Sequence, residues 1–253
     1  MSNFSVHDRK YKVKLPSLSS ALLAYETGVH IGDGSLQIID GSTHSIRYFG
    51  HSEDDYLYYR DVLPAIVQQL YNKKVQPGKR KKGKTCYISI CSKKVAFFKR
   101  DILGLPAGNK IHLQRLPSFI VEDDILLKNM LRGIADTDFS LYFKKNREGL
   151  SVYPEISCVM SNKMLVHELA KFLGHFGFRV TTQFGVKRER NGTVTIEHRV
   201  SFCGRAQLAS WMSTVGFWNP KHYTKYLIWK RFGFCPPQLS TSERLMILNS
   251  NPP

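Results

Sequence analysis

The sequence predicts a mixed α+β protein built from two copies of an αββαββα unit, each with an antiparallel sheet. Two observations predict this fold class. Residues 22–36 (LLAYETGVHIGDGSL) and 127–141 (LKNMLRGIADTDFSL) are alike, and the strand and helix patterns that follow them come in the same order. At 253 residues, the chain is also long enough to bury two cores without disulfides or structural metals.

The first copy is expected at residues 1–103. It opens with an apolar helical pattern that ends at Asp33. The later elements of this copy are, in order, strands at 36–40 and 45–50, a helix of period 3.6 at 53–71, a strand at 85–91 and a helix at 93–103. Pro106, Gly108 and Pro117 then indicate a linker at 104–120.

The second copy is expected at residues 121–253. Its first helical pattern ends at Asp138. It continues with strands at 139–144 and 152–159, a helix at 162–176, strands at 179–186 and 193–202, and a helix at 205–215. Asn219 and Pro220 predict the start of a last helix at 221–231.

The charge of the chain indicates an extended polyanion as its partner. Lys and Arg number 37 against 20 Asp and Glu, which gives a net charge of +17 spread from Lys10 to Lys230. Nucleic acid fits this balance best, because each phosphate that a basic side chain neutralises releases condensed counterions. A membrane partner is not expected, since no apolar run approaches about 18 residues.

The N-terminal sequence and the cysteines together favour a cytoplasmic protein. The N-terminal sequence lacks the apolar core of a signal peptide. The five cysteines are odd in number and form no C-x-x-C pair, so we expect neither a disulfide framework nor a zinc knuckle.

Each repeated segment carries small residues four positions apart, Gly28 with Gly32 and Gly133 with Thr137. Residues at i and i+4 share one face of a helix, so each helix has a stripe along which two backbones can touch. Such a stripe is more often plain helix packing than chemistry. Here the packing itself would bring together the acids that end the two helices.

Those acids are Asp33 and Asp138, and they predict a shared metal site. Two adjacent carboxylates repel each other unless a cation lies between them. Mg²⁺, with Mn²⁺ as the possible alternative, suits a site of oxygen ligands. The backbone carbonyls of the last helical turn, at Gly32 and Thr137, add negative charge at the same point. A metal beside a phosphodiester supports its hydrolysis.

Nine positions of each copy, ETGVHIGDG at 26–34 and LRGIADTDF at 131–139, resemble the two motifs of single-chain LAGLIDADG homing endonucleases. The second copy is the closer match. CSKKVAFFKRDILGLPAGNK at 91–110 and NPKHYTKYLIWKRFGFCPP at 219–237 are similar to archaeal members of that family. The resemblance covers roughly residues 15–237.

The resemblance implies a pseudo-twofold pair of LAGLIDADG subdomains that form a DNA-binding saddle. It implies an intron-encoded monomer that makes a staggered double-strand break in one long DNA target. In the family the last acid of each motif binds the metal, so Asp33 and Asp138 become the candidate ligands and catalytic residues. Polar or basic residues lie near the scissile phosphates, and His51 and Lys144 are the candidates here.

Two positions depart from the family pattern. Glu26 opens the first motif where an apolar residue is usual, so it must reach solvent or a partner. Phe139 replaces the glycine after the second acid, so its backbone must avoid positive φ. The penultimate acid, Asp136, is implied to be structural, and Ile31 takes its place in the first copy.

Alternating strand positions of such a saddle would contact bases, while a basic loop at 76–84 would contact phosphates. The candidate DNA contacts of the first copy are Gln37, Arg47, Tyr48, Lys79, Arg80, Lys81, Lys82 and Lys84. Those of the second copy are Tyr142, Lys144, Arg147, Gln183, Lys187, Arg188, Arg190, His198 and Arg199. The tyrosines and phenylalanines in helical patterns, among them Tyr58 and Tyr59, are assigned to core faces.

Two other classes of function remain open. The same fold could serve as an RNA maturase or a sequence-specific nucleic-acid-binding module, with intron RNA as a possible partner. The most conservative alternative is a structural nucleic-acid-binding protein that has no sequence preference.

Overall fold

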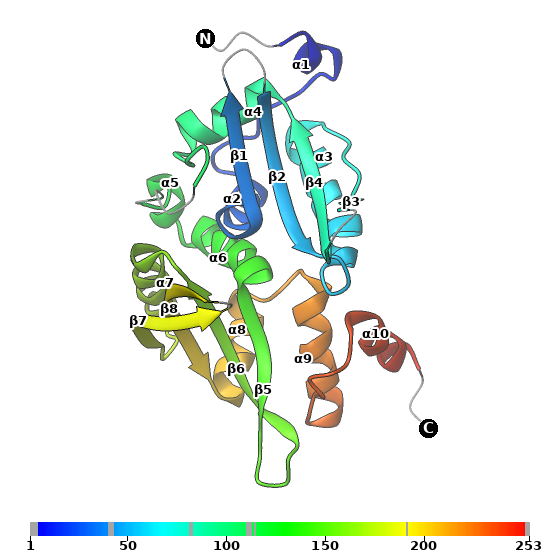
Figure 1. Cartoon of the computed structure of the whole chain (residues 1–253), viewed down its shortest axis with the longest axis vertical. Coiled ribbons are helices and arrows are strands. Elements are labelled where there is room, and N and C mark those ends of the chain that lie inside the picture. Colours follow the sequence, from blue (N-terminus) through cyan, green and yellow to red (C-terminus); the bar gives the residue numbers. More distant parts are fainter. Residues whose placement is uncertain are drawn as a thin grey trace. The chain divides into compact units, whose positions relative to one another are not determined.

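The computed structural model describes residues 5–39, 43–80, 83–109, 113, 115–190 and 192–250, and of Arg190 only the backbone. By its internal packing the chain divides into two compact units, residues 1–137 and 138–253. Each unit contains a four-stranded antiparallel sheet with helices packed on it (Figure 1). The two units are described separately below.

Unit 1 begins with a short helix and then contains the first copy of the repeat. Its elements are α1 (Val6–Lys10), α2 (Ala21–Asp33), β1 (Gly34–Ile39), β2 (Thr43–His51), η1 (Tyr58–Val62), α3 (Leu63–Tyr71), β3 (Gly78–Lys79), β4 (Thr85–Cys91), α4 (Lys93–Phe97), η2 (Phe98–Ile102), α5 (Ser118–Val121) and α6 (Asp124–Asp138), whose last residue opens unit 2. Ser20 caps α2, because its side chain accepts a hydrogen bond from the backbone N–H of Leu23.

Unit 2 contains the second copy and a C-terminal addition. Its elements are β5 (Phe139–Lys145), β6 (Ser151–Met160), α7 (Lys163–His175), β7 (Thr181–Arg190), β8 (Thr193–Cys203), α8 (Arg205–Thr214), α9 (Pro220–Phe232) and α10 (Thr241–Asn249). Asn162 caps α7, and Asn219 caps α9 ahead of Pro220.

The two sheets have the same topology. The strand order is β1-β2-β4-β3 in the first and β5-β6-β8-β7 in the second, and every neighbouring pair is antiparallel. The predicted α+β fold, with two αββαββα repeats of antiparallel sheets, is therefore confirmed. In the first repeat the third strand is reduced to Gly78–Lys79.

The boundary between the units lies later in the chain than the predicted linker at 104–120. It falls between Thr137 and Asp138, because α6 packs on α2 and so joins unit 1. The predicted subdomains, 1–103 and 121–253, follow the sequence repeat, whereas the compact units follow packing. The repeat division stays a prediction, as does the saddle formed by the two sheets.

A buried ion pair explains how Glu26 is accommodated in α2. The Nζ of Lys99 lies 2.7 Å from the Glu26 carboxylate, and both side chains are almost fully buried. Tyr71 donates a hydrogen bond to the same carboxylate at 2.9 Å, and Tyr48 donates another. Glu26 thus has the partner that an apolar helix position requires.

The helix predicted at 53–71 is interrupted by a π-helical turn, η1. Pro64 has no N–H and cannot bond the carbonyl of Arg60, and the N–H of Leu63 instead bonds the carbonyl of Tyr58. This turn carries Tyr58 and Tyr59 together, and both side chains are fully buried.

The last predicted helix, 221–231, is α9, whereas α10 was not predicted. Arg244 of α10 is buried and joins the two helices. Its Nε donates to Thr224 Oγ1 at 2.8 Å, and a terminal nitrogen donates to the Lys221 carbonyl at 3.1 Å. Among the described helices, none is both long enough and apolar enough to cross a membrane.

Candidate active site and nucleic-acid interface

The helices α2 and α6 touch backbone to backbone through two glycines. A Cβ added to Gly28 would lie 2.1 Å from the carbonyl oxygen of Met130, and one added to Gly133 would lie 2.1 Å from that of Tyr25. No side chain fits at either point. Of the predicted small-residue stripes, Gly28 and Gly133 are therefore shown to form a close helix contact within unit 1.

Asp33 ends α2 and is half-buried. The hydroxyl of Tyr59 donates a hydrogen bond to its Oδ2 at 2.9 Å. Burial, followed by the charge of Asp33, raises the pKa of Tyr59 well above its ordinary value, so the hydroxyl stays protonated. Gly50 leaves room for the Tyr59 ring, because a Cβ there would lie 2.4 Å from a ring carbon. Tyr59 thus fixes the orientation of this carboxylate.

Asp136 is fully buried, and two hydrogen-bonded tyrosines, Tyr25 and Tyr58, hold its carboxylate in place. Tyr25 donates to its Oδ2 at 2.6 Å, and the hydroxyls of Tyr25 and Tyr58 lie 2.6 Å apart. A buried carboxylate with these partners has a structural position, which agrees with the role that the resemblance implies for it. Its counterpart, Ile31, is buried in the core.

Asp138 follows Thr137 at the start of unit 2, immediately before β5, and is half-buried. Burial, followed by the charge of Asp138, raises the pKa of the Cys158 thiol on β6. The Thr137 hydroxyl donates to the helix carbonyls of Ile134 and Gly133 at 3.0 and 3.1 Å, and the backbone carbonyl of Thr137 is the predicted oxygen donor of this residue.

His51 ends β2, with its side chain 38% exposed. Its Nδ1 lies 3.4 Å from the Asp54 carboxylate, and its backbone N–H donates to Asp55. Gly50, its neighbour, lies against the ring of Tyr59. The auxiliary catalytic role of His51 stays a prediction.

The oxygen donors at the helix ends suit a hard divalent cation. Within the residues that the structure describes, no group of three or more His, Cys, Asp and Glu side chains is placed to hold a metal ion. Mg²⁺ keeps several waters and needs only one or two carboxylates, so it does not depend on such a group. The carboxylates of Asp33 and Asp138 and the carbonyls of Gly32 and Thr137 are all oxygen donors.

The face of the first sheet that points away from α2 is polar and basic. We call it the outer face of the first sheet, and it includes Ser35, Gln37, Ser45, Arg47, Phe49, Tyr87 and Ser89. A shallow pocket of about 580 Å³ on it is lined by Arg47, Phe49, Lys79, Arg80, Tyr87 and Ser89. The Arg80 guanidinium lies 4.9 Å from the centre of the Phe49 ring. Three predicted DNA contacts therefore share one aromatic and cationic surface.

The other predicted contacts of unit 1 differ in their surroundings. Gln37 is exposed on β1. Lys84 is exposed and pairs with Glu53 at 3.2 Å. Lys81 and Lys82 lie outside the described residues. These four assignments stay predictions.

The assignment of Tyr48 as a DNA contact is wrong. Its side chain is 1% exposed and donates a hydrogen bond to Glu26 in the core. Successive strand residues point to opposite faces, so Arg47 and Tyr48 cannot both face a groove. The side chains of Ile46 and Tyr48 point inward, and that of Arg47 points outward.

The polar face of the second sheet carries a network centred on Glu155. Lys144 and Arg199 both form ion pairs with this carboxylate, and Arg199 also donates to the Tyr142 hydroxyl at 2.7 Å. Burial alone would raise the pKa of Glu155, but hydrogen bonds from Lys144 and Tyr142 and the nearby positive charges hold it below its ordinary value. Three predicted DNA contacts thus meet at one buried anion that the sequence reading missed.

Strand geometry places the backbone of Lys144 well along β5 from Asp138, and the auxiliary catalytic role of Lys144 stays a prediction. Phe139 follows Asp138 and opens β5, and Lys144 is the sixth residue of that strand. Five steps along an extended strand span about 16 Å. Lys144 also pairs with Glu155 instead of turning back toward Asp138. Its role as a DNA contact stays a prediction.

The β7–β8 ribbon and the β5–β6 turn carry the remaining predicted contacts. Gln183, Lys187, Arg188 and, in the turn, Arg147 are exposed. Arg188 pairs with Glu197 at 2.9 Å. Arg190 pairs with Thr193 in the ladder, and its side chain lies outside the described part of the chain.

The assignment of His198 as a base contact is also wrong. Its side chain is 7% exposed, and its Nδ1 accepts a hydrogen bond from the N–H of Gly185 at 3.1 Å. That bond lies where the β7–β8 register shifts between Gln183 and Val186. His198 therefore stabilises the irregular ribbon.

Comparisons with known proteins bear on the fold. No family model matches the chain, and no curated protein does. A solved structure described as "I-DmoI in complex with DNA and Mn" is 14% identical, with a TM-score of 0.51, and the match covers 78% of this chain and 96% of that one.

Two further solved structures complete the comparison. "The homing endonuclease I-WcaI bound to its DNA recognition sequence" is 13% identical, with a TM-score of 0.53 and coverage of 88% and 93%. "LAGLIDADG homing endonuclease I-GzeII in complex with DNA target" is 10% identical, with a TM-score of 0.47 and coverage of 90% and 97%. The likeness to I-DmoI and I-WcaI shows that the chain has the fold of these proteins.

Proposed function

We propose that this chain is a site-specific DNA endonuclease of the homing type, which makes a staggered double-strand break in one long target by metal-dependent hydrolysis of phosphodiesters. The contact of α2 with α6 at Gly28 and Gly133 carries the proposal. Each glycine stands five residues before an acid, since 33 − 28 = 138 − 133 = 5. The solved homing endonucleases with this fold include complexes with DNA and with Mn.

Asp33 and Asp138 would hold the divalent cation, with the carbonyls of Gly32 and Thr137 as further oxygen donors. Mg²⁺ is the ion that we propose, with Mn²⁺ as an alternative. When bound, such an ion lowers the pKa of a water molecule and stabilises the leaving oxygen of the phosphodiester.

The chain's own residues position these groups. Tyr59 donates to Asp33 and orients its carboxylate. The glycine contact sets the spacing of the two helices that carry the acids. His51 is proposed to assist at the scissile phosphate from the end of β2. One chain carries both acids, so we propose that a monomer is active.

Binding is proposed to use the outer face of the first sheet and the polar face of the second. Arg47 and Arg80 on the first sheet and Arg199 on the second have the planar donors that recognise guanine edges and phosphates. A net charge of +17 supplies the sequence-independent part of the affinity.

The test is selection of cleaved duplexes from a randomised or genomic library in Mg²⁺. We expect cleaved ends that map to one long sequence with a constant stagger, and no cleavage after chelation of the metal. Cleavage of many unrelated sequences would contradict site specificity. An intact library from which the protein retains one duplex or an RNA would instead identify a binding module, and retention without sequence preference would identify a non-specific binder.

A further inference from the structure

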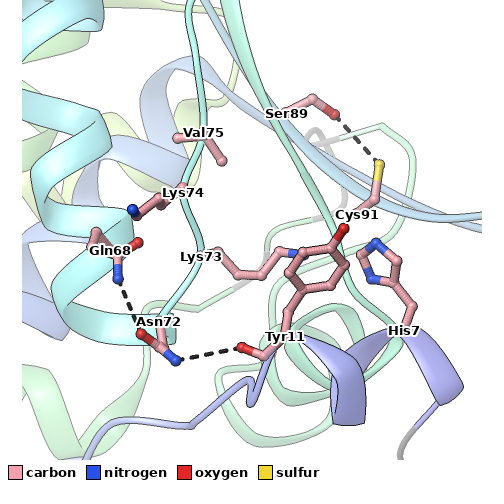
Figure 2. A pocket seen from close by; sticks show the side chains of 9 residues that line it. All are labelled: His7, Tyr11, Gln68, Asn72, Lys73, Lys74, Val75, Ser89 and Cys91. Carbon is pink, nitrogen blue, oxygen red and sulfur yellow. Dashed lines mark hydrogen bonds between the residues drawn. The ribbon is translucent and has the colours of Figure 1, made fainter.

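A second pocket in unit 1 adjoins the outer face of the first sheet. It has a volume of about 450 Å³ and lies between the N-terminal segment, the chain that follows α3, and the end of β4. Figure 2 shows Lys73 and Lys74 on the chain after α3, Tyr11 and His7 on the N-terminal segment, and Ser89 on β4. We call it the arm pocket, because the N-terminal arm forms one wall.

Hydrogen bonds at both ends of the N-terminal arm hold the walls of the arm pocket in place. Asp8 of α1 is fully buried and accepts hydrogen bonds from Ser92 Oγ at 2.6 Å and from the N–H of Lys94 at 3.1 Å. Asn72, which ends α3 with a φ of 54°, donates to the carbonyl of Lys12 at 3.3 Å. The pocket is therefore preformed.

Lys73 is a buried cation, and its side chain lines this pocket. Its side chain is 8% exposed, and its Nζ lies 4.4 Å from the centre of the Tyr11 ring. Burial lowers the pKa of Lys73, although Asp8 and then Cys91 raise it in part. Among the described residues, none forms an ion pair with Lys73. A buried ammonium in an open pocket favours an anion as its ligand.

The arm pocket is continuous with the outer face of the first sheet. Ser89 lines both this pocket and the shallow pocket that contains Arg47 and Arg80. Ser89 also pairs directly with Arg47 across the β2–β4 ladder. A nucleic-acid strand that lies on the outer face would therefore run onto the arm pocket.

We propose that the arm pocket binds a backbone phosphate of the DNA, at the flank of the bases that the first sheet contacts. Lys73 is the central cation, and the exposed Lys74 and His7 lie at the rim of the pocket. This inference rests on the proposed function. It assigns a phosphate subsite to the N-terminal arm and the chain after α3, which lie outside the four strands of the sheet.

The experiment measures binding of a mixed-sequence duplex to the full chain by fluorescence anisotropy over a salt series, with metal chelated. For duplex DNA the slope of log K against log salt is about −0.9 per neutralised phosphate. Lys73→Gln should weaken binding and make the slope shallower by about 1. Lys73→Arg keeps the charge and should retain the wild-type slope.

Two further variants separate a phosphate contact from other effects. Lys74→Gln changes an exposed side chain, so it tests the pocket even if Lys73→Gln unfolds the protein, and it should also make the slope shallower. Lys171→Gln, an exposed lysine on α7, is the matched control and should leave the slope unchanged.

The outcomes distinguish this inference from the function on which it rests. Wild-type slopes in both the folded Lys73→Gln and the Lys74→Gln variants would overturn the phosphate subsite while leaving duplex binding intact. Failure of the wild-type protein to bind any duplex at low salt would overturn the proposed function together with the subsite.

Discussion

At the scale of single residues, the candidate site depends on groups that lie far from the motifs in sequence. Tyr59 reaches Asp33 across 26 positions, and Arg199 reaches Glu155 across 44. Both arrangements place a protonated or charged donor on a carboxylate. The first orients a proposed metal ligand, and the second orders side chains on a proposed DNA-contacting face.

The first prediction concerns Tyr59→Phe, which removes the hydrogen bond to Asp33 and keeps the ring against Gly50. A hydrogen bond to a charged group contributes about 1.5–3 kcal/mol, so single-turnover cleavage should slow by about tenfold or more. Duplex affinity should stay at the wild-type value.

The matched control is Tyr56→Phe. In the wild-type protein the ring of Tyr56 lies under the amino group of Lys79. This variant should cleave at the wild-type rate. Equal single-turnover rates for wild type and Tyr59→Phe would show that Tyr59 does not position the carboxylate.

Some residues of the candidate site could be predicted from the sequence, and others could not. Asp33 and Asp138 were found because the segments around them repeat. Tyr59 was assigned to the core, since nothing in its local pattern distinguishes a buried tyrosine that bonds a carboxylate from one that only packs. Tyr48 was misassigned because the polar residues at the start of β2 obscure which alternate positions face inward.

At the scale of elements, the crossing of α2 and α6 allows no side chain at its centre. Gly133→Ala would place a methyl group 2.1 Å from a backbone carbonyl oxygen of the facing helix, and a backbone cannot move aside as a side chain can. Overpacking of this kind costs about 1–3 kcal/mol or more.

The prediction is therefore a lower free energy of unfolding for Gly133→Ala, measured in urea. Gly174→Ala is the control, because that helical glycine of α7 has no atom within 4 Å of an added Cβ. It should be stabilised by about 0.5–1 kcal/mol, as expected for alanine in a helix. Equal stability of Gly133→Ala and wild type would contradict the close crossing.

Element boundaries were predicted well where capping and alternation agree. The strand predicted at 85–91 matches β4, because Ser92 caps the next helix and the buried positions alternate. Neither π-helical turn, η1 or η2, was predicted, since a hydrogen bond one residue longer than usual leaves no mark in a 3.6-residue apolar period. α10 was missed because Arg244, a charged residue, holds it in place.

At the scale of the whole molecule, the sequence repeat predicts two units of one topology, and the two sheets have it. The units do not divide where the repeat does, because α6 leaves its own copy to pack on α2. The packing of α6 on α2 depends on contacts between segments that are distant in sequence, which spacing and composition alone do not encode. It makes the helix pair part of the core of unit 1.

The charge of the molecule and its paired acids have separate consequences. Under the proposed function, 37 basic residues against 20 acidic ones would drive binding to any duplex, with strong dependence on salt. The two acids should affect cleavage and leave affinity nearly unchanged. We therefore expect substitutions to separate binding from cleavage.

The measurement that tests the central claim most directly uses the duplex recovered by selection. Asp33→Asn, Asp138→Asn and the control Asp101→Asn, an exposed carboxylate paired with Arg100, are compared for binding and for double-strand cleavage in Mg²⁺. We predict that the first two variants bind as wild type does and make no double-strand break, while Asp101→Asn cuts normally. Cleavage of both strands at the wild-type rate by either of the first two variants would contradict the account.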